Sequence, residues 1–103
     1  MISFMDAIAL SKNGVLIRLP DERWEHIVQR HEDLASRQSE VLATVSDPMQ
    51  VFAGDGGECL AIRQLEPRKW VVVAYRELIN DGFIITAYTT RRFSSLKRQQ
   101  LWP

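Results

Sequence analysis

The sequence predicts an α+β fold in which two N-terminal helices pack on a four-stranded antiparallel meander sheet. Apolar residues recur at helical spacing between residues 21 and 45. From residue 49 onward the pattern changes to short apolar runs separated by turns rich in Gly, Asn, Asp and Pro, which is typical of strands. The chain has 103 residues, of which 46% are hydrophobic, enough for one core, so residues 1–103 are expected to form a single domain.

A first helix is expected from Asp21, after Pro20, to His31. Its apolar positions, three and four residues apart, are Trp24, Ile27 and Val28. The same spacing brings His31 onto this stripe at the end of the helix. A second helix is expected over 36–45, and Asp47-Pro48 ends it, since the residue before a proline avoids the helical conformation.

The strands of the meander are expected over 49–53, 58–64, 70–77 and 83–90. An additional N-terminal hairpin is expected from Ala7–Leu10 and Val15–Leu19 at an edge of the sheet, because Asn13-Gly14 between them favours a tight turn. The tail, 91–103, carries Phe93, Leu96 and Leu101 at roughly helical intervals and is expected to form a short helix.

The composition excludes several functional classes. A single cysteine, Cys59, cannot form an internal disulfide, and Asp6 lies where a signal peptide would carry positive charge, so a cytoplasmic location is expected. No apolar run is long enough for a membrane span. Two histidines and one cysteine do not make a closed zinc site, and no phosphate-binding glycine loop is present. Neither a metal nor a cofactor is expected.

Charge is divided unevenly between the two halves of the chain. Residues 1–58 hold five Lys or Arg against ten Asp or Glu, a net charge of −5, and residues 59–103 hold eight against three, a net charge of +5. A basic region of this kind permits binding to a nucleic acid, because phosphate contacts depend on local cations. A solvated, charged tail would give the same pattern.

His31 is the first candidate for chemistry. Imidazole exchanges a proton near neutral pH, so it can act as acid or base in phosphodiester cleavage. The alternative is a histidine that ends the helix and binds a loop carbonyl. His26 lies on the polar face of the same helix and is expected at the surface.

A second group of candidates lies on the last predicted strand. Alternation places Thr86, Tyr88 and Thr90 on one face together with Ile84, and Arg91 and Arg92 follow directly. Hydroxyl groups beside cations can hold a phosphate, although Thr and Tyr are also ordinary strand formers. Further cations that could bind a phosphate are Arg63, Arg68, Lys69 and Arg76.

The segments RWEHIVQRHEDL, VLATVSDPMQV, WVVVAY and DGFIITAYTTRR resemble the phage-associated subgroup of the barnase, EndoU, colicin and RelE-like (BECR) nuclease superfamily. The resemblance covers residues 19–92. It implies a helical N-terminal part on a four-stranded antiparallel sheet. It also implies metal-independent endoribonuclease activity, in which the 2′-hydroxyl of the RNA is the nucleophile.

On this resemblance, the implied catalytic residues are His31 as general acid or base, Arg63 or Lys69 as the phosphate-stabilising cation, and Thr86, Tyr88 and Thr90 as positioning groups. The residues expected to bind substrate are Arg30, Arg76, Arg91 and Arg92. The sequence analysis therefore predicts a toxin-like or phage-derived ribonuclease acting on tRNA or mRNA, with an antitoxin or immunity protein as a further partner. The alternatives are a non-catalytic RNA-binding or protein-binding domain of the same fold and a purely structural subunit.

Overall fold

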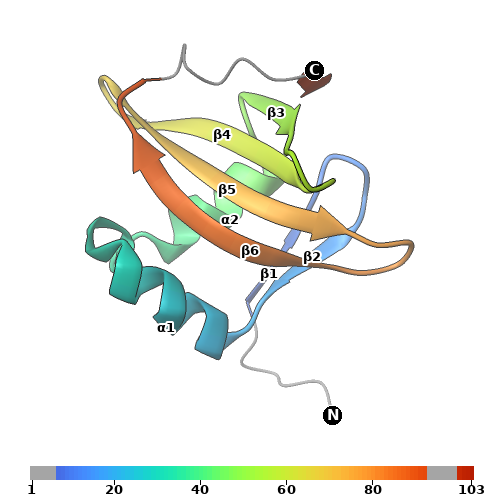
Figure 1. Ribbon diagram of the computed structural model, residues 1–103, viewed down its shortest axis with the longest axis horizontal. Helices are drawn as coiled ribbons and strands as arrows, with labels where there is room; N and C mark the ends of the chain where they lie inside the picture. Colours follow the sequence, from blue (N-terminus) through green and yellow to red (C-terminus); the bar gives the residue numbers. More distant parts are fainter. Residues whose placement is uncertain (1–6, 93–99) are drawn as a thin grey trace.

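The computed structural model describes residues 7–92 and 100–103. The helical segments are α1 (Asp21–Arg30), the short 3₁₀ helix η1 (Glu32–Leu34) and α2 (Gln38–Ser46). The strands are β1 (Ala7–Leu10), β2 (Leu16–Leu19), β3 (Gln50–Ala53), β4 (Cys59–Glu66), β5 (Lys69–Glu77), β6 (Gly82–Thr90) and β7 (Gln100–Trp102). The strands form one sheet, and both α-helices lie against the same face of it (Figure 1).

The sheet is mixed and has seven strands, in the order β1-β2-β6-β5-β4-β3-β7. Strands β3 to β6 pair antiparallel with their neighbours in the sequence. The β1–β2 hairpin joins the same sheet through a parallel pairing of β2 with β6, and β7 adds to β3. The prediction of two helices on a four-stranded antiparallel meander was therefore wrong, because the expected hairpin makes the sheet mixed through its parallel pairing with β6, and β7 adds a seventh strand.

The parallel contact between β2 and β6 depends on a glycine. Ile17 pairs with Gly82, and Arg18 pairs with Phe83. A Cβ atom on residue 82 would lie 2.5 Å from Cδ1 of Ile17 and 2.5 Å from the carbonyl oxygen of Arg76, which is too close for carbon. The missing side chain of Gly82 is therefore what lets β2 approach β6.

Apolar side chains are buried on both faces of the sheet. The cluster on the helix side includes Ile17, Ile27, Leu34, Val41, Val45, Val71, Val73 and Ile84. The opposite face carries a smaller cluster, made of Phe52, Leu60, Ile62, Val72 and Ala74. Two covered faces agree with the nearly continuous apolar runs of β5 and β6, since such strands lose the alternation of polar and apolar residues.

The first helix begins as predicted, after Pro20. Its start has no side-chain cap, and the amide of Trp24 donates to the carbonyl of Pro20 at 3.0 Å. The second helix begins at Gln38, two residues later than predicted. None of the helices in residues 7–92 and 100–103 is long and apolar enough to cross a membrane.

The expected C-terminal helix was wrong for the residues that can be compared. Gln100–Trp102 form the edge strand β7, paired antiparallel with β3. Pairing with an exposed edge satisfies backbone groups that an isolated helix of a few residues could not satisfy. Phe93 and Leu96, which suggested the helix, lie outside the described residues.

Candidate active site at the end of β6

The candidate site lies where the last part of β6 passes the C-terminal end of α1. Strand β2 pairs with β6 only at Gly82 and Phe83. Along its other edge β6 pairs with β5 throughout. On the edge that faces β2, no described strand pairs with β6 beyond Phe83, and α1 packs beside that edge (Figure 1). A helix end and a free strand edge are thereby brought together.

A β-bulge decides which side chains β6 presents here. The register with β5 shifts, so that Tyr75 pairs with Ile84 whereas Ala74 pairs with Thr86. Ile85 is the extra residue in β6. As a result Ile84 is buried in the cluster on the helix side. The strict alternation assumed in the sequence analysis was therefore wrong at Ile84.

Thr86, Tyr88 and Thr90 share the face of β6 that is turned away from the helices. Their partners on β5 are Ala74, Val72 and Trp70. Tyr88 packs against the cluster on this face, and Oγ1 of Thr90 accepts a hydrogen bond of 3.1 Å from the amide of Arg92. All three side chains are half-buried, so their hydroxyl groups form a polar row at the end of β6.

His31 reaches Tyr88 from the end of α1. It follows the last helical residue, and its amide donates to the carbonyl of Ile27 at 2.8 Å. The centroids of the His31 and Tyr88 rings are 6.3 Å apart, with the planes tilted by 40°. This spacing lies within the range of favourable aromatic pairs. The predicted acid or base and one predicted positioning residue are thus neighbours.

Asp33 connects η1 to two strands, and the sequence analysis missed it. Its Oδ2 accepts a hydrogen bond of 2.7 Å from Oγ1 of Thr89, and Nζ of Lys69 lies 3.6 Å from the same oxygen. The hydrogen bond from Thr89 is the main cause that lowers the pKa of Asp33; partial burial opposes it and the charge of Lys69 adds to it. No motif marks Asp33, because both partners are distant in the sequence.

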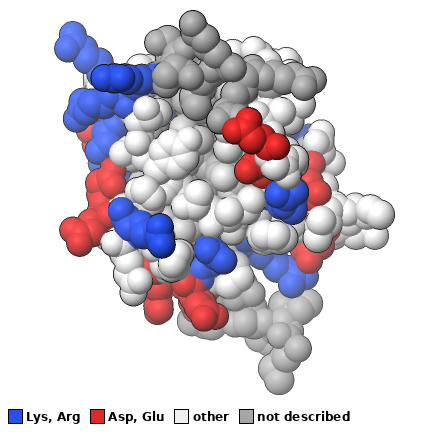
Figure 2. Space-filling model, in the orientation of Figure 1, with Lys and Arg blue, Asp and Glu red and all other residues white. Residues whose placement is uncertain are grey.

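Three arginines predicted to bind substrate lie next to this region in the sequence and are exposed. Arg30 precedes His31, while Arg91 and Arg92 follow Thr90. Figure 2 shows Lys and Arg side chains gathered at the upper left, over the end of the sheet where β6 finishes, with acidic side chains below them. This end of the molecule therefore offers cations that a polyanion could reach.

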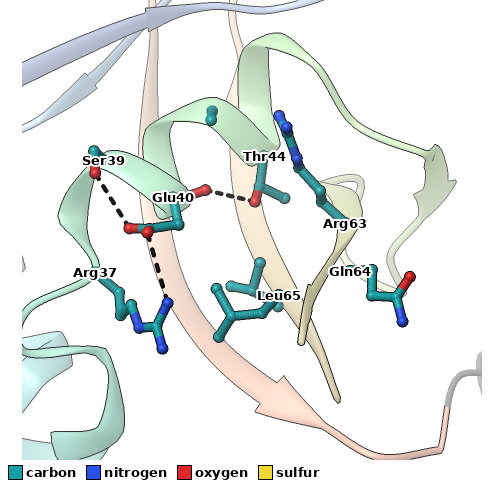
Figure 3. Close-up of a pocket in the computed structure, with 9 residues that line it drawn as sticks. Arg37, Ser39, Glu40, Thr44, Arg63, Gln64 and Leu65 are labelled. Carbon is teal, nitrogen blue, oxygen red and sulfur yellow. Dashed lines mark hydrogen bonds and ion pairs between the residues drawn. The ribbon is translucent and has the colours of Figure 1, made fainter. Parts of the chain in front are cut away.

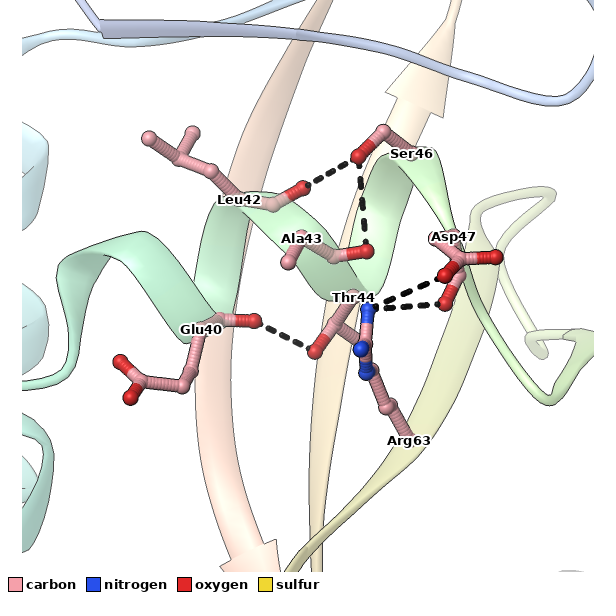
Figure 4. Close-up of polar contacts among 7 residues, drawn as sticks. All are labelled: Glu40, Leu42, Ala43, Thr44, Ser46, Asp47 and Arg63. Atoms are coloured by element: carbon pink, nitrogen blue, oxygen red, sulfur yellow. Dashed lines mark hydrogen bonds and ion pairs between the residues drawn. The ribbon is translucent and has the colours of Figure 1, made fainter.

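Arg63 lies on a different surface. It is on β4 opposite Val71, and therefore on the helix side of the sheet, whereas Tyr88 faces the other side. Its Nη1 is 3.3 Å from the carbonyl oxygen and 3.4 Å from Oδ2 of Asp47, at the end of α2 (Figure 4). The structure does not bring Arg63 together with His31.

Arg63 lines a groove of about 410 Å³ between α2 and β4 (Figure 3). At the other end of the groove, Nη2 of Arg37 binds Glu66 at 2.7 Å, and Nη1 lies 3.6 Å from Glu40. The arginines of the groove are thus matched by carboxylates. Thr44, which is fully buried, donates to the carbonyl of Glu40 at 2.7 Å. The polar contacts of this groove stabilise the packing of α2 on the sheet.

Arg76 also lies away from the candidate site. Its Nη2 donates to the carbonyl oxygen of Gly56, in the turn between β3 and β4, at 3.0 Å. On β5 it is four residues beyond Val72, the partner of Tyr88, which is about 13 Å along a strand. Arg76 therefore supports the turn rather than the row of hydroxyl groups.

Over the part of the chain that the structure describes, no three His, Cys, Asp or Glu side chains are grouped as metal ligands would be. Near the end of β6 the fold brings His31 to Tyr88, whose face of the sheet also carries Thr90. Asp33 meets Thr89 and Lys69 on the helix side of the same strand end. Comparisons of the chain with models of protein families, with curated proteins and with solved structures found no significant match.

Proposed function

We propose that this chain is a small metal-independent endoribonuclease whose site is formed by His31 and the end of β6. The observation that carries the proposal is the proximity of the His31 and Tyr88 rings, whose centroids are 6.3 Å apart, at the end of the molecule where Lys and Arg side chains gather (Figure 2). Cleavage by the 2′-hydroxyl of RNA requires a group that transfers a proton and cations that balance the phosphate. This end of the molecule offers both.

In the proposed reaction, His31 accepts the proton of the 2′-hydroxyl, which attacks the neighbouring phosphorus. The bond from phosphorus to the 5′ oxygen of the next nucleotide breaks, that oxygen takes a proton from water, and a 2′,3′-cyclic phosphate remains on the other fragment, while His31 releases its proton to solvent. The hydroxyl group of Tyr88 orients the phosphate, while Arg91 and Arg92 balance its charge. Arg63 and Arg76 have no part in this proposal, because they contact Asp47 and Gly56.

One observation favours the alternative, a protein that binds RNA without cutting it. Lys69 was predicted to stabilise the charge that develops on the phosphate, yet its ammonium group lies beside the carboxylate of Asp33. A cation that is already paired stabilises a phosphate less than an unpaired one. Binding through the exposed arginines would survive this pairing, whereas catalysis through Lys69 would require that Lys69 leaves Asp33.

The test is incubation of the purified protein with total tRNA and a structured mRNA in EDTA, which inhibits contaminating metal-dependent nucleases. We compare wild type with His31→Ala, with Tyr88→Phe and with His26→Ala as the matched control, since His26 is an exposed histidine on the same helix. Circular dichroism establishes that each variant is folded. The expected products carry 2′,3′-cyclic phosphate ends.

We expect wild type and His26→Ala to cut alike, His31→Ala to lose at least about 100-fold in rate, and Tyr88→Phe to lose less. Equal cleavage by His31→Ala and His26→Ala would remove His31 from the mechanism. If wild type cuts no RNA but binds it with an affinity that falls steeply as salt rises, the binding module is the better account.

A further inference from the structure

His31 lies in the break between α1 and η1. Its backbone angles, φ −136° and ψ 73°, are outside the helical range, so it ends one helix and precedes the next. Its amide donates to the carbonyl of Ile27 at 2.8 Å, and its carbonyl accepts a hydrogen bond of 3.0 Å from the amide of Leu34. The position of the His31 ring therefore depends on where these two helices lie.

Each of the two helices has one buried side chain that holds it on the sheet. Ile27 is the buried residue of α1 and Leu34 that of η1, and both belong to the cluster on the helix side. Apolar burial has no preferred direction, so it keeps the helices on the sheet without orienting the turn between them. No described strand pairs with this edge of β6, so the turn is not oriented by a strand either.

Asp33 supplies a contact that does have a direction. Its Oδ2 accepts a hydrogen bond of 2.7 Å from Oγ1 of Thr89, and Nζ of Lys69 lies 3.6 Å from the same oxygen. A hydrogen bond depends on both distance and angle, so this contact fixes η1 at one position along β6.

The turn straddles the edge of β6. Thr89 pairs with Val71, which belongs to the cluster on the helix side, whereas Tyr88 packs on the opposite face. Asp33 therefore contacts β6 on one face, and His31, two residues earlier, contacts it on the other. A change in the contact of Asp33 must alter how His31 meets Tyr88.

We propose that Asp33 is a positioning residue, whose hydrogen bond with Thr89 keeps the His31 ring beside Tyr88. In this arrangement Lys69 balances the charge of Asp33. The inference rests on the proposed function for the role of His31 in proton transfer, but the position of the ring can be measured without RNA.

The contact lies at the surface, and this limits the expected effect. The side chain of Asp33 is 39% exposed. The loss of such a contact can displace the ring by no more than its own small free energy. We therefore expect kcat to fall about twofold to fivefold without the hydrogen bond, and KM to stay the same, since neither Asp33 nor Thr89 contacts RNA in the proposed reaction.

The first test is NMR spectroscopy of the free protein, in which the nuclear Overhauser effect reports the proximity of the His31 and Tyr88 ring protons. Asp33→Ala and Thr89→Val remove the hydrogen bond, whereas Thr89→Ser keeps the hydroxyl donor. Asp47→Ala is the matched control, since Asp47 is another carboxylate that follows a helix and pairs with an arginine. Circular dichroism establishes that each variant is folded.

We expect the effect between the two rings to weaken in Asp33→Ala and in Thr89→Val, and to keep its strength in Thr89→Ser and in Asp47→Ala. The double variant Asp33→Ala/Thr89→Val should equal Asp33→Ala, because both changes remove the same hydrogen bond. The ring signals of His26, which is exposed on α1, should not shift. An unchanged effect in Asp33→Ala and Thr89→Val, or an equal loss in Asp47→Ala, would overturn the proposal.

Cleavage of RNA by the same variants separates this inference from the proposed function. We expect Thr89→Ser to cut at the wild-type rate and Thr89→Val and Asp33→Ala to lose kcat as stated above. If wild type cuts and all variants cut equally, Asp33 does not position His31 for the reaction and the inference fails. If wild type cuts no RNA, the ribonuclease proposal fails, and the NMR measurement still decides whether Asp33 positions the ring.

Discussion

The two ends of β6 are built differently, although they belong to one strand of nine residues. At its beginning, Gly82 lets Ile17 approach the backbone, and an added atom has no room. At its end, the contacts are polar and close to solvent, such as the hydrogen bond from Thr89 to Asp33. The first end is held by close packing and the second by polar groups. Substitutions at the first end should therefore change stability more than substitutions at the second.

The largest effect on stability is expected from Gly82→Ala. The new Cβ would lie 2.5 Å from both Ile17 Cδ1 and the carbonyl of Arg76, so β2 must move away from β6. We expect a loss of about 2–3 kcal/mol in the free energy of unfolding, measured by urea denaturation. Gly56→Ala is the control, since its nearest contact would be at 3.6 Å. If both variants were equally stable, the tight contact between β2 and β6 would be disproved.

A smaller loss is expected when the hairpin turn is released from β5. The carboxylate of Glu77 accepts hydrogen bonds from Oγ of Ser11, which is buried, and from Nδ2 of Asn13 at 2.9 Å. Glu77→Ala leaves the Ser11 hydroxyl without this partner, and we expect a loss of about 1–2 kcal/mol by urea denaturation. Glu66→Ala, which removes an exposed ion pair with Arg37, should cost about 0.5 kcal/mol or less. The reverse order would show that Glu77 does not fix the turn.

The smallest effect is expected at the end of β6, from Asp33→Asn. Thr89 and Lys69 lower the pKa of Asp33 below its ordinary value of 3.8. The ionised form therefore stabilises the fold at pH values above 3.8, and this contribution is lost as the pH falls through the lower pKa of the folded state. Because the side chain of Asp33 is 39% exposed, the contribution is expected to be a few tenths of a kcal/mol.

Urea denaturation of wild type and Asp33→Asn at a series of pH values from 6 to 2.5 measures this difference. We expect the gap in stability between them to close below about pH 4, in the range where carboxylates become protonated. A gap that stays constant over the whole range would mean that the charge of Asp33 contributes nothing. Asp21→Asn, on an exposed residue of the first helical turn, is the control for a general loss of negative charge.

The helices and the central strands could be predicted from local patterns, since their periodicity is strong and their ends carry Pro, Asp or Gly. The strand that the hairpin joins could not. Its strands were recognised, but the pairing of β2 with β6 joins residues 17 and 82, and no local pattern records which strand a hairpin meets. In the sequence, Gly82 is the one residue whose lack of a side chain could have suggested a close contact. A glycine at this position also fits a turn, so the sequence did not distinguish the two roles.

The candidate site was predicted in part. His31 and Tyr88 are near each other in the structure, whereas Arg63 and Arg76 lie on other surfaces. The sequence contains thirteen Lys or Arg residues, and their charge alone does not reveal which of them share a surface. Asp33 was missed because it is singled out only by its contacts with Thr89 and Lys69, which lie on two different strands.

By itself, the sequence determined the local elements, because hydrophobic period and turn residues act within a few positions of the chain. Only the tertiary structure decided that seven strands form one mixed sheet, that the bulge at Ile85 turns Ile84 into the core, and that His31 lies beside Tyr88. These features depend on contacts between distant residues, which are fixed by how the whole core packs.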